Sequence, residues 1–270
     1  MEIREKVSKL ISLVREKNPL IHHITNYVTV NDCANITIAI GGSPVMADDI
    51  NEASDMASIA SALVINIGTL NSRTVESMIA SGRKANEIGI PVILDPVGIG
   101  ATSFRTKATE DLIKKIQFSV IRGNMSEIKM IAGVESKIKG VDSIGSKEGG
   151  EEIALSLSKR LSCIVAITGA RDIISDGRRI CIIKNGHSML SKVTGTGCMT
   201  TSLIGSFCGA SSDYYLSAIA GITAMGLAGE KSFEALSVKT YLGDFKVSIF
   251  NIIASLTEED VLKGGNLYEK

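Results

Sequence analysis

Short, continuous apolar segments alternate with segments of helical periodicity along much of this chain, and that alternation constrains the fold most strongly. The apolar segments include LVINI at 63–67, VIL at 92–94 and SVI at 119–121, without regular polar alternation. Strands that are apolar on both faces are typical of a parallel sheet covered by helices on both sides. We therefore predict one α/β domain over residues 1–270, with a doubly wound, mostly parallel sheet flanked by helices.

Turn and cap residues place the individual elements along the chain. Asp176-Gly177 and Asn185-Gly186 are typical hairpin turns, so we predict a β-meander at the sheet edge. Asp48 or Asp49 is expected to cap a helix. We predict strands at 20–30 (a short edge strand or loop), 63–67, 91–95, 118–122, 163–168, 172–175, 179–183 and 189–193. We predict helices at 1–16, 30–40, 48–62, 72–88, 105–116, 125–132, 147–161, 199–209, 214–229 and 233–255. Residues 133–150 are predicted to be an exposed connection.

Composition excludes several classes of partner. Lys+Arg and Asp+Glu both number 29 in the 270 residues, and no block of basic residues occurs. Aromatic residues make up 4% and Trp is absent, so base-stacking surfaces have little to be built from. We therefore expect a small-molecule partner and no nucleic acid.

Cysteine usage and apolar segments bear on the compartment. The five cysteines show no CxxC spacing, which indicates reduced thiols in a cytoplasmic protein. Residues 1–16 combine charges with helical apolar spacing, so they predict an amphipathic helix and no signal peptide. The uncharged run 193–212 begins with a glycine turn, so we expect a buried helix there and no membrane span.

Polar side chains follow the predicted strands. In a doubly wound sheet, ligands bind beyond the carboxyl ends of the strands. Asp95 with Glu127 could hold Mg²⁺, and Arg122 suits phosphate oxygens. Asn124 and Thr168 end two further strands on the same rim. For each of these residues taken singly, the alternative is a role as a helix cap or as an ordinary turn residue.

Residues 192–200, KVTGTGCMT, form a glycine-punctuated turn that leads into a predicted helix. Gly195 and Gly197 permit a tight backbone, and the first N–H groups of a helix have no internal partner. Such a turn predicts an anion site for phosphate. A plain connection between strand and helix is the alternative.

Four positions in the first 50 residues are candidates for ligand contacts. His22 and His23 are adjacent in an extended segment and point to opposite faces, so both are predicted to be structural. Asn26 carries an amide in an apolar stretch and needs a partner, either within the protein or in a ligand. Met46, expected in a loop beside glycines, is either core or an adaptable pocket wall.

Seven segments together resemble the hydroxyethylthiazole kinase family within the ribokinase-like superfamily. They are ITNYV (24–28), GGSPVMA (41–47), NIGTL (66–70), LDPVGIGAT (94–102), IRGNMSEI (121–128), ITGARDIISDG (167–177) and KVTGTGCM (192–199). The resemblance implies an ATP-dependent kinase that phosphorylates the primary alcohol of 4-methyl-5-(2-hydroxyethyl)thiazole in thiamine salvage. It also implies a homotrimer with the thiazole site where subunits meet.

The resemblance assigns roles to particular residues. Asn26 and Met46 would line the thiazole pocket, with Gly195 beside the substrate hydroxyl. The larger set falls into three groups: Arg122 and Thr168 for the ATP phosphates; Asp95, Asn124 and Glu127 for Mg²⁺; Gly195, Gly197 and Cys198 for the anion hole and catalysis.

Cys198 departs from the wider superfamily, in which an Asp at this position accepts the hydroxyl proton; members of the thiazole kinase family resemble this chain in having Cys. A thiol is mostly protonated at pH 7 unless a helix N-terminus lowers its pKa. We therefore predict a slow kinase that relies on Mg²⁺, Arg122 and the anion hole.

Other readings of the same motifs stay open at this stage. The fold could serve a hydroxymethylpyrimidine or pyridoxal kinase. A non-kinase is the third class, either a dehydratase that repairs hydrated nicotinamide cofactors or a ligand sensor. The absence of the Asp, together with the intact phosphate and metal residues, weighs against this third class.

Overall fold

A single nine-stranded sheet organises the protein. The computed structural model describes residues 2–139, 149–236 and 241–270. The strand order is β2-β1-β3-β4-β5-β6-β7-β8-β9. The strands are β1 (Leu20–Ile24), β2 (Ser43–Met46), β3 (Ala62–Asn66), β4 (Val92–Asp95), β5 (Val120–Asn124), β6 (Ile164–Thr168), β7 (Asp172–Ser175), β8 (Ile180–Ile183) and β9 (Leu267–Glu269).

The first six strands pair in parallel, as the continuous apolar segments predicted. β3 and β4 are buried along their whole length. Their register places Asn66 opposite Asp95, and the next pairs place Asn124 opposite Thr168. The carboxyl ends of these strands therefore meet along one rim, where ligands bind in sheets of this type.

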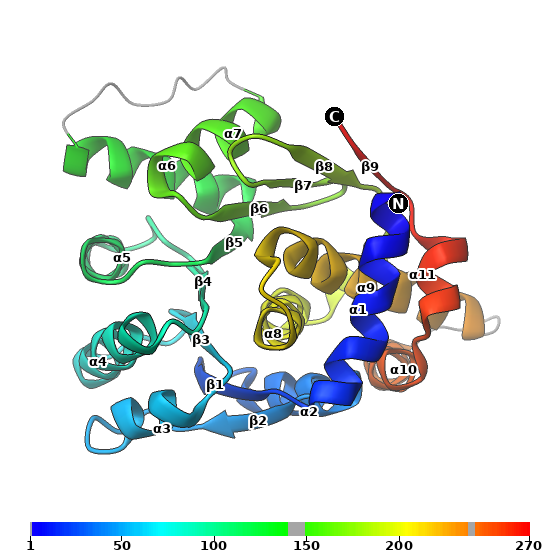
Figure 1. Ribbon diagram of the computed structural model, residues 1–270, viewed down its shortest axis with the longest axis horizontal. Coiled ribbons are helices and arrows are strands. Elements are labelled where there is room, and N and C mark those ends of the chain that lie inside the picture. The colour runs from blue at the N-terminus through cyan, green and yellow to red at the C-terminus, as the bar shows by residue number, and fades with distance from the viewer. Residues whose placement is uncertain (1, 140–148, 237–240) are drawn as a thin grey trace.

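Helices cover both faces of the sheet (Figure 1). One layer contains α3 (Ala53–Ile59), α4 (Ser72–Ile88), α5 (Ser103–Lys115), α6 (Met125–Lys139) and α7 (Gly150–Leu161). The other contains α1 (Ile3–Lys17), α2 (Val30–Ile40), α8 (Thr196–Ala210), α9 (Tyr214–Ala235) and α10 (Leu242–Ser255), with α11 (Glu258–Gly264) packed against α1. The predicted doubly wound α/β architecture is confirmed.

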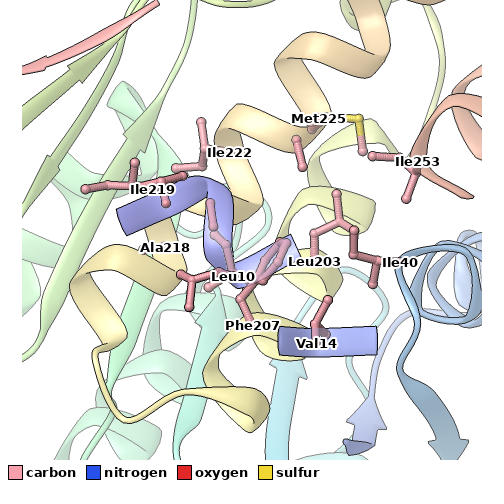
Figure 2. Packing of buried hydrophobic residues seen from close by; sticks show 14 of the residues in the cluster. Leu10, Val14, Ile40, Leu203, Phe207, Ala218, Ile219, Ile222, Met225 and Ile253 are labelled. Atoms are coloured by element: carbon pink, nitrogen blue, oxygen red, sulfur yellow. The ribbon is translucent and has the colours of Figure 1, made fainter. Parts of the chain in front are cut away.

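The layer that contains α8 and α9 has the larger apolar core. Figure 2 shows Phe207 and Leu203 of α8 among side chains from α1, α2, α9 and α10. Both residues have no exposed surface. Nearly every residue of α8 is buried, which explains its lack of amphipathic character and confirms the predicted buried helix. No helix in the described ranges is long and apolar enough to cross a membrane.

Two predictions near the N-terminus were wrong. β1 lies inside the sheet between β2 and β3, and is not an edge strand. Residues 43–46, predicted as a loop, form the edge strand β2, so Met46 ends a strand. The short run was missed because its partner, β1, lies about twenty residues earlier, and pairing across that distance leaves no local signal.

The predicted strand at 189–193 was also wrong, because η1 (Ser188–Lys192) is a 3₁₀ helix. His187 Nδ1 accepts a hydrogen bond from the Met189 N–H, and Leu190 and Val193 close local turns. The open edge of β8 is instead taken by β9 at the C-terminus. The predicted meander is thus confirmed for β6, β7 and β8, but its last strand comes from the chain end.

Helix boundaries differ from prediction at several places. α3 begins at Ala53 with Glu52 as N-cap, because the Asp49 carboxylate accepts hydrogen bonds from Asn51 instead. α8 begins at Thr196, three residues before the predicted start at 199. The helix predicted at 233–255 is divided between the end of α9 and α10, with 237–240 outside the described residues. Within the connection predicted at 133–150, residues 133–139 belong to α6. Residues 140–148 lie outside the described residues.

The contact between α8 and α9 generates a test of packing. A Cβ added to Gly221 would lie 2.7 Å from the Ile204 backbone nitrogen. Gly221→Ala is therefore expected to lower the free energy of unfolding by about 1–3 kcal/mol. The control is Gly133→Ala, where nothing lies within 4 Å and helix propensity should add about 0.5–1 kcal/mol. Urea unfolding measures both, and equal stabilities would contradict the packing argument.

Candidate active site

The start of α8 is an open helix N-terminus. Gly195, the N-cap, has a φ of +94°, and no side chain of the described residues caps this end. The first helical hydrogen bond runs from Met199 N–H to the Gly195 carbonyl at 2.8 Å. The N–H groups of residues 196–198 therefore lack intrahelical acceptors, and the helix dipole adds partial positive charge there. This geometry suits a bound anion such as phosphate.

Gly195 is required here for both conformation and space. Its positive φ is strained for a residue with a side chain. A Cβ at this position would lie 2.7 Å from Thr29 Cγ2, which belongs to the segment between β1 and α2. The turn predicted from the glycine pattern is therefore packed against the loop that carries Asn26.

A cavity of about 700 Å³ opens beside this helix end. Its volume is that of a small-molecule site. Four of the predicted site residues line it, namely Arg122, Asn124, Thr168 and Gly197. Further lining comes from Gly169, Ala170, Asp172, Asn185, Gly186, His187, Ser188, Leu190, Ser191, Thr196, Thr200, Ile222, Met225 and Gly226.

Arg122 links the cavity to the helix end. Its guanidinium donates a hydrogen bond to Thr168 Oγ1. A Cβ added to Gly197 would lie 2.7 Å from Arg122 Nη1, so only glycine lets the guanidinium approach the α8 backbone this closely. The cation and the free N–H groups thus face the same space, as expected for a site that binds phosphate oxygens.

Asp95 lies behind Arg122 and has no exposed surface. Its Oδ2 accepts hydrogen bonds from Asn66 and Thr201, each at 2.9 Å. Its Oδ1 lies 3.8 Å from Arg122 Nη1, and no hydrogen-bond donor of the described residues reaches it. Burial raises the pKa of Asp95 to about 6, despite the opposing effect of Arg122. At neutral pH this is an ionised, partly unsatisfied carboxylate.

Glu127 joins two loops of the rim. Its carboxylate accepts N–H bonds from Gly98 at 3.0 Å and Asn124 at 2.8 Å. Asn124 Oδ1 in turn accepts the Glu127 N–H at 2.9 Å, a reciprocal arrangement at the start of α6. Glu127 is close enough to Asp95 to raise the pKa of that carboxyl.

These carboxylates fit a magnesium ion that is shared with a nucleotide. Mg²⁺ is commonly bound by one or two carboxylates together with substrate phosphates and water. Asp95 Oδ1 has an unused acceptor position, and Glu127 lies nearby. In the described part of the chain, no three acidic, histidine or cysteine side chains form a complete cation site. Phosphate oxygens would have to complete the coordination.

Cys198 belongs to a hydrogen-bonded cluster on the other side of the α8 start. Its Sγ accepts hydrogen bonds from Asn66 Nδ2 at 3.3 Å and Asn26 Nδ2 at 3.4 Å. Burial and the negative charge of Asp95 raise the pKa of Cys198. The helix N-terminus therefore does not make this thiol a thiolate, and Cys198 stays protonated at neutral pH.

Asn26 and Met46 lie on the same rim, but neither is among the described residues that line the cavity. Asn26 is 4% exposed, and its carbonyl oxygen accepts hydrogen bonds from the N–H and hydroxyl of Thr29. Met46 ends β2, opposite His23 of β1, and is half-buried. Their assignment to the thiazole pocket stays a prediction.

The histidine pair of β1 is structural in its contacts. Both rings are fully buried, with His22 Nε2 bonded to the Ala47 carbonyl and His23 Nδ1 to the Ile21 carbonyl. Burial lowers the pKa of both, that of His23 to about 4. Both are neutral at pH 7.

Sequence reasoning missed three polar residues of the site. Asn66 ends β3 inside an apolar run, Thr201 lies one turn into α8, and Asp172 lines the cavity. Asp172 accepts the Gly169 N–H at 2.9 Å, and burial raises its pKa to about 6. A signal for Asn66 did exist, because it ends a parallel strand beside the one that ends at Asp95.

Comparison with known proteins agrees with this geometry. The model of the hydroxyethylthiazole kinase family matches residues 11–259. The chain belongs to this family. It is 56% identical over 270 residues to the hydroxyethylthiazole kinase of Alkaliphilus oremlandii, covering 100% of both chains, and 56% identical over 274 residues to that of Clostridium beijerinckii, covering 99% of each. The family assignment made from the motifs is confirmed.

Solved structures of kinases share the fold. A hydroxyethylthiazole kinase from Pyrococcus horikoshii OT3 superposes with a TM-score of 0.90 at 35% identity, covering 98% of this chain and 99% of that one. A pyridoxal kinase from Staphylococcus aureus has a TM-score of 0.60 at 13% identity, covering 78% and 87%, which shows likeness of fold alone. The predicted ribokinase-like architecture is confirmed.

The burial of Asp95 generates a pH-dependent prediction. The folded protein holds this proton more tightly than the unfolded chain, so the native state binds more protons between about pH 4 and pH 6. The free energy of unfolding contributed by Asp95 therefore falls as pH rises through that window. Between pH 4 and pH 7, the free energy of unfolding of wild type is expected to fall by about 1–3 kcal/mol relative to that of Asp95→Asn.

Thermal and urea unfolding from pH 4 to pH 8 measure this difference. Glu76→Gln, at an exposed position of α4, controls for the loss of a carboxyl group elsewhere. Parallel stability curves for wild type and Asp95→Asn would contradict the argument.

Proposed function

We propose that this protein transfers the γ-phosphoryl group of ATP to the primary hydroxyl of 4-methyl-5-(2-hydroxyethyl)thiazole, in thiamine salvage in the cytoplasm. The observation that carries the proposal is the open N-terminus of α8, which faces the Arg122 guanidinium across Gly197. Phosphoryl transfer needs this combination of backbone N–H groups and a cation. Membership of the hydroxyethylthiazole kinase family supports the choice of acceptor.

A coupled assay of ADP release tests the proposal with purified protein, ATP and Mg²⁺. The thiazole alcohol should support turnover, whereas pyridoxal and hydroxymethylpyrimidine should support at most a few per cent of that rate. Preference for either of those alcohols would reassign the acceptor. Absence of ADP release with every alcohol would refute a kinase function.

ATP would occupy the cavity of about 700 Å³. In this proposal Arg122 and Thr168 contact its phosphates, and their mutual hydrogen bond fixes the guanidinium before the nucleotide arrives. Such preorganisation lowers the entropic cost of orienting the transferred group. The N–H groups of Gly197 and Cys198 then face the γ-phosphoryl group.

Magnesium would be held by Asp95 and Glu127 directly or through water, with Asn124 at the same rim. When bound, Mg²⁺ neutralises charge on the β- and γ-phosphates. Glu127 is already fixed by the Gly98 and Asn124 N–H groups, so its carboxylate keeps a defined position beside the phosphates.

The acceptor hydroxyl would lie beside Gly195 and Cys198. Because the Cys198 thiol is protonated, it orients the hydroxyl by hydrogen bonding and does not act as a strong base. A loose phosphoryl-transfer transition state needs little general-base help. Arg122 and the N–H groups of α8 stabilise the charge on the transferred group, and slow turnover follows from the lack of an efficient base.

Asn26, Met46 and Gly195 would form the thiazole pocket at the interface of a homotrimer. Large apolar side chains are exposed beside this region, with Tyr27 79%, Val28 58% and Ile38 59% exposed. Such a group of exposed residues is typical of an interface between subunits. Sedimentation equilibrium should give three times the 28.6 kDa chain mass. Ile38→Glu should dissociate the trimer and abolish activity, and a fully active monomer would contradict this part of the proposal.

Gly197→Ala tests the approach of Arg122 to α8. The added Cβ would displace the guanidinium, whose Nη1 lies 2.7 Å from its position, without disturbing the core. We expect kcat/KM for ATP to fall by about 10- to 100-fold with the fold retained. Gly133→Ala is the control for a Gly to Ala change in a helix. Wild-type kinetics in Gly197→Ala would contradict the role of this contact.

Cys198→Asp tests the role of the thiol. The Asn26 and Asn66 amides that now donate to sulfur could donate to a carboxylate, which would supply an ionised proton acceptor. Turnover should rise severalfold with the fold unchanged. Cys198→Ser is the matched control for a protonated side chain and should stay at or below the wild-type rate. An Asp variant that binds substrate normally yet turns over much more slowly would defeat the idea.

A further inference from the structure

Asn66 lies at the centre of the site, at the end of the apolar strand β3. It is 2% exposed, and its side chain makes four hydrogen bonds to four different residues. We infer that Asn66 is the positioning residue that holds the Asp95 carboxylate and the Cys198 thiol in their working orientations. The inference rests on the proposed function, because it concerns the same reaction.

The donor half of the amide connects the two sides of the site. Asn66 Nδ2 donates to Asp95 Oδ2 at 2.9 Å and to Cys198 Sγ at 3.3 Å. Asp95 lies behind Arg122 on the phosphate side, whereas Cys198 lies at the acceptor side of the α8 N-terminus. One NH₂ group therefore fixes the distance between the metal-side carboxylate and the thiol.

The acceptor half prevents the amide from turning. Asn66 Oδ1 accepts hydrogen bonds from Asn26 Nδ2 at 3.0 Å and from the Gly68 N–H at 2.9 Å. A rotated amide would direct its NH₂ group at these two donors and its oxygen at the Asp95 carboxylate. All four bonds would be lost, so the orientation is determined by the donors and acceptors around it.

Asn26 extends the same arrangement to the thiol. Its Nδ2 donates to both Asn66 Oδ1 and Cys198 Sγ. Because both amides donate to the sulfur, neither can accept its S–H through the same group, and the S–H is directed to another acceptor. The orientation of the thiol toward an acceptor hydroxyl thus depends on Asn66 both directly and through Asn26.

The change Asn66→Asp would be nearly isosteric but would remove the donor group. An oxygen would replace the NH₂ group that lies 2.9 Å from Asp95 Oδ2, and an ionised carboxylate can donate to neither Asp95 nor Cys198. Thr201 would still donate to Asp95, so the fold should survive.

The experiment compares Asn66→Asp and Asn66→Ala with wild type at pH 8, using the thiazole alcohol, ATP and Mg²⁺. In both variants kcat should fall on the order of 10- to 100-fold, with KM for ATP within about threefold of wild type. If kcat stays within about twofold of wild type, or if KM for ATP rises as much as kcat falls, the inference is overturned.

The matched control is Asn71→Ala. Asn71 is an exposed asparagine that follows the same strand, β3, and caps α4 by accepting the Thr74 N–H at 3.0 Å. Its loss should lower the melting temperature and leave kcat unchanged. A fall of kcat in Asn71→Ala equal to that in the Asn66 variants would show general destabilisation and would also overturn the inference.

A second readout needs no substrate. In a crystal structure of Asn66→Ala, the Asp95 carboxylate and the Cys198 side chain should be displaced from their wild-type positions, whereas in Asn71→Ala both should keep them. Unchanged positions in Asn66→Ala would overturn the inference. An inactive wild type would refute the proposed function alone, since this structural comparison would still decide the inference.

Discussion

A carboxylate without exposed surface, Asp95, is the constraint on which the rest of the site depends. Burying a charge costs several kcal/mol unless hydrogen bonds and an opposite charge compensate. Asn66, Thr201 and Arg122 supply that compensation from three different elements, β3, α8 and β5. The compensation is incomplete, because burial still raises the pKa of Asp95 to about 6. The protein thus carries a destabilising charge at the place where a metal and phosphate would use it.

The topology of the sheet places these groups close together without long loops. Parallel strands end on one rim, so β3, β4 and β5 present Asn66, Asp95 and Arg122 side by side. α8 is buried across β3 and β4, and its open N-terminus points at the same rim. Gly197 brings the Arg122 guanidinium close to the α8 backbone. The proposed phosphate-binding side and the proposed acceptor side therefore meet at one helix end.

Local sequence signals predicted the features that depend on residues close together in the chain. The helix at 72–88 was predicted residue for residue, and the structure caps it with Asn71 at one end and Gly89 at the other. Continuous apolar runs predicted the parallel sheet, and strand ends indicated Asp95, Arg122 and Thr168. Pairing between distant segments was not predictable in this way, so β2 and β9 were missed. The network around Asn66 and the raised pKa of Cys198 were not predictable either, because both depend on burial in the folded structure.

We propose that the start of α8 and the Arg122 side of the cavity form a single phosphoryl-transfer centre. A crystal structure with a non-hydrolysable ATP analogue, Mg²⁺ and the thiazole alcohol tests it most directly. The γ-phosphoryl group should lie within hydrogen-bond distance of the N–H groups of residues 197–198 and of Arg122, with the alcohol oxygen beside Gly195. A nucleotide bound elsewhere, or with its phosphates directed away from α8, would contradict the claim.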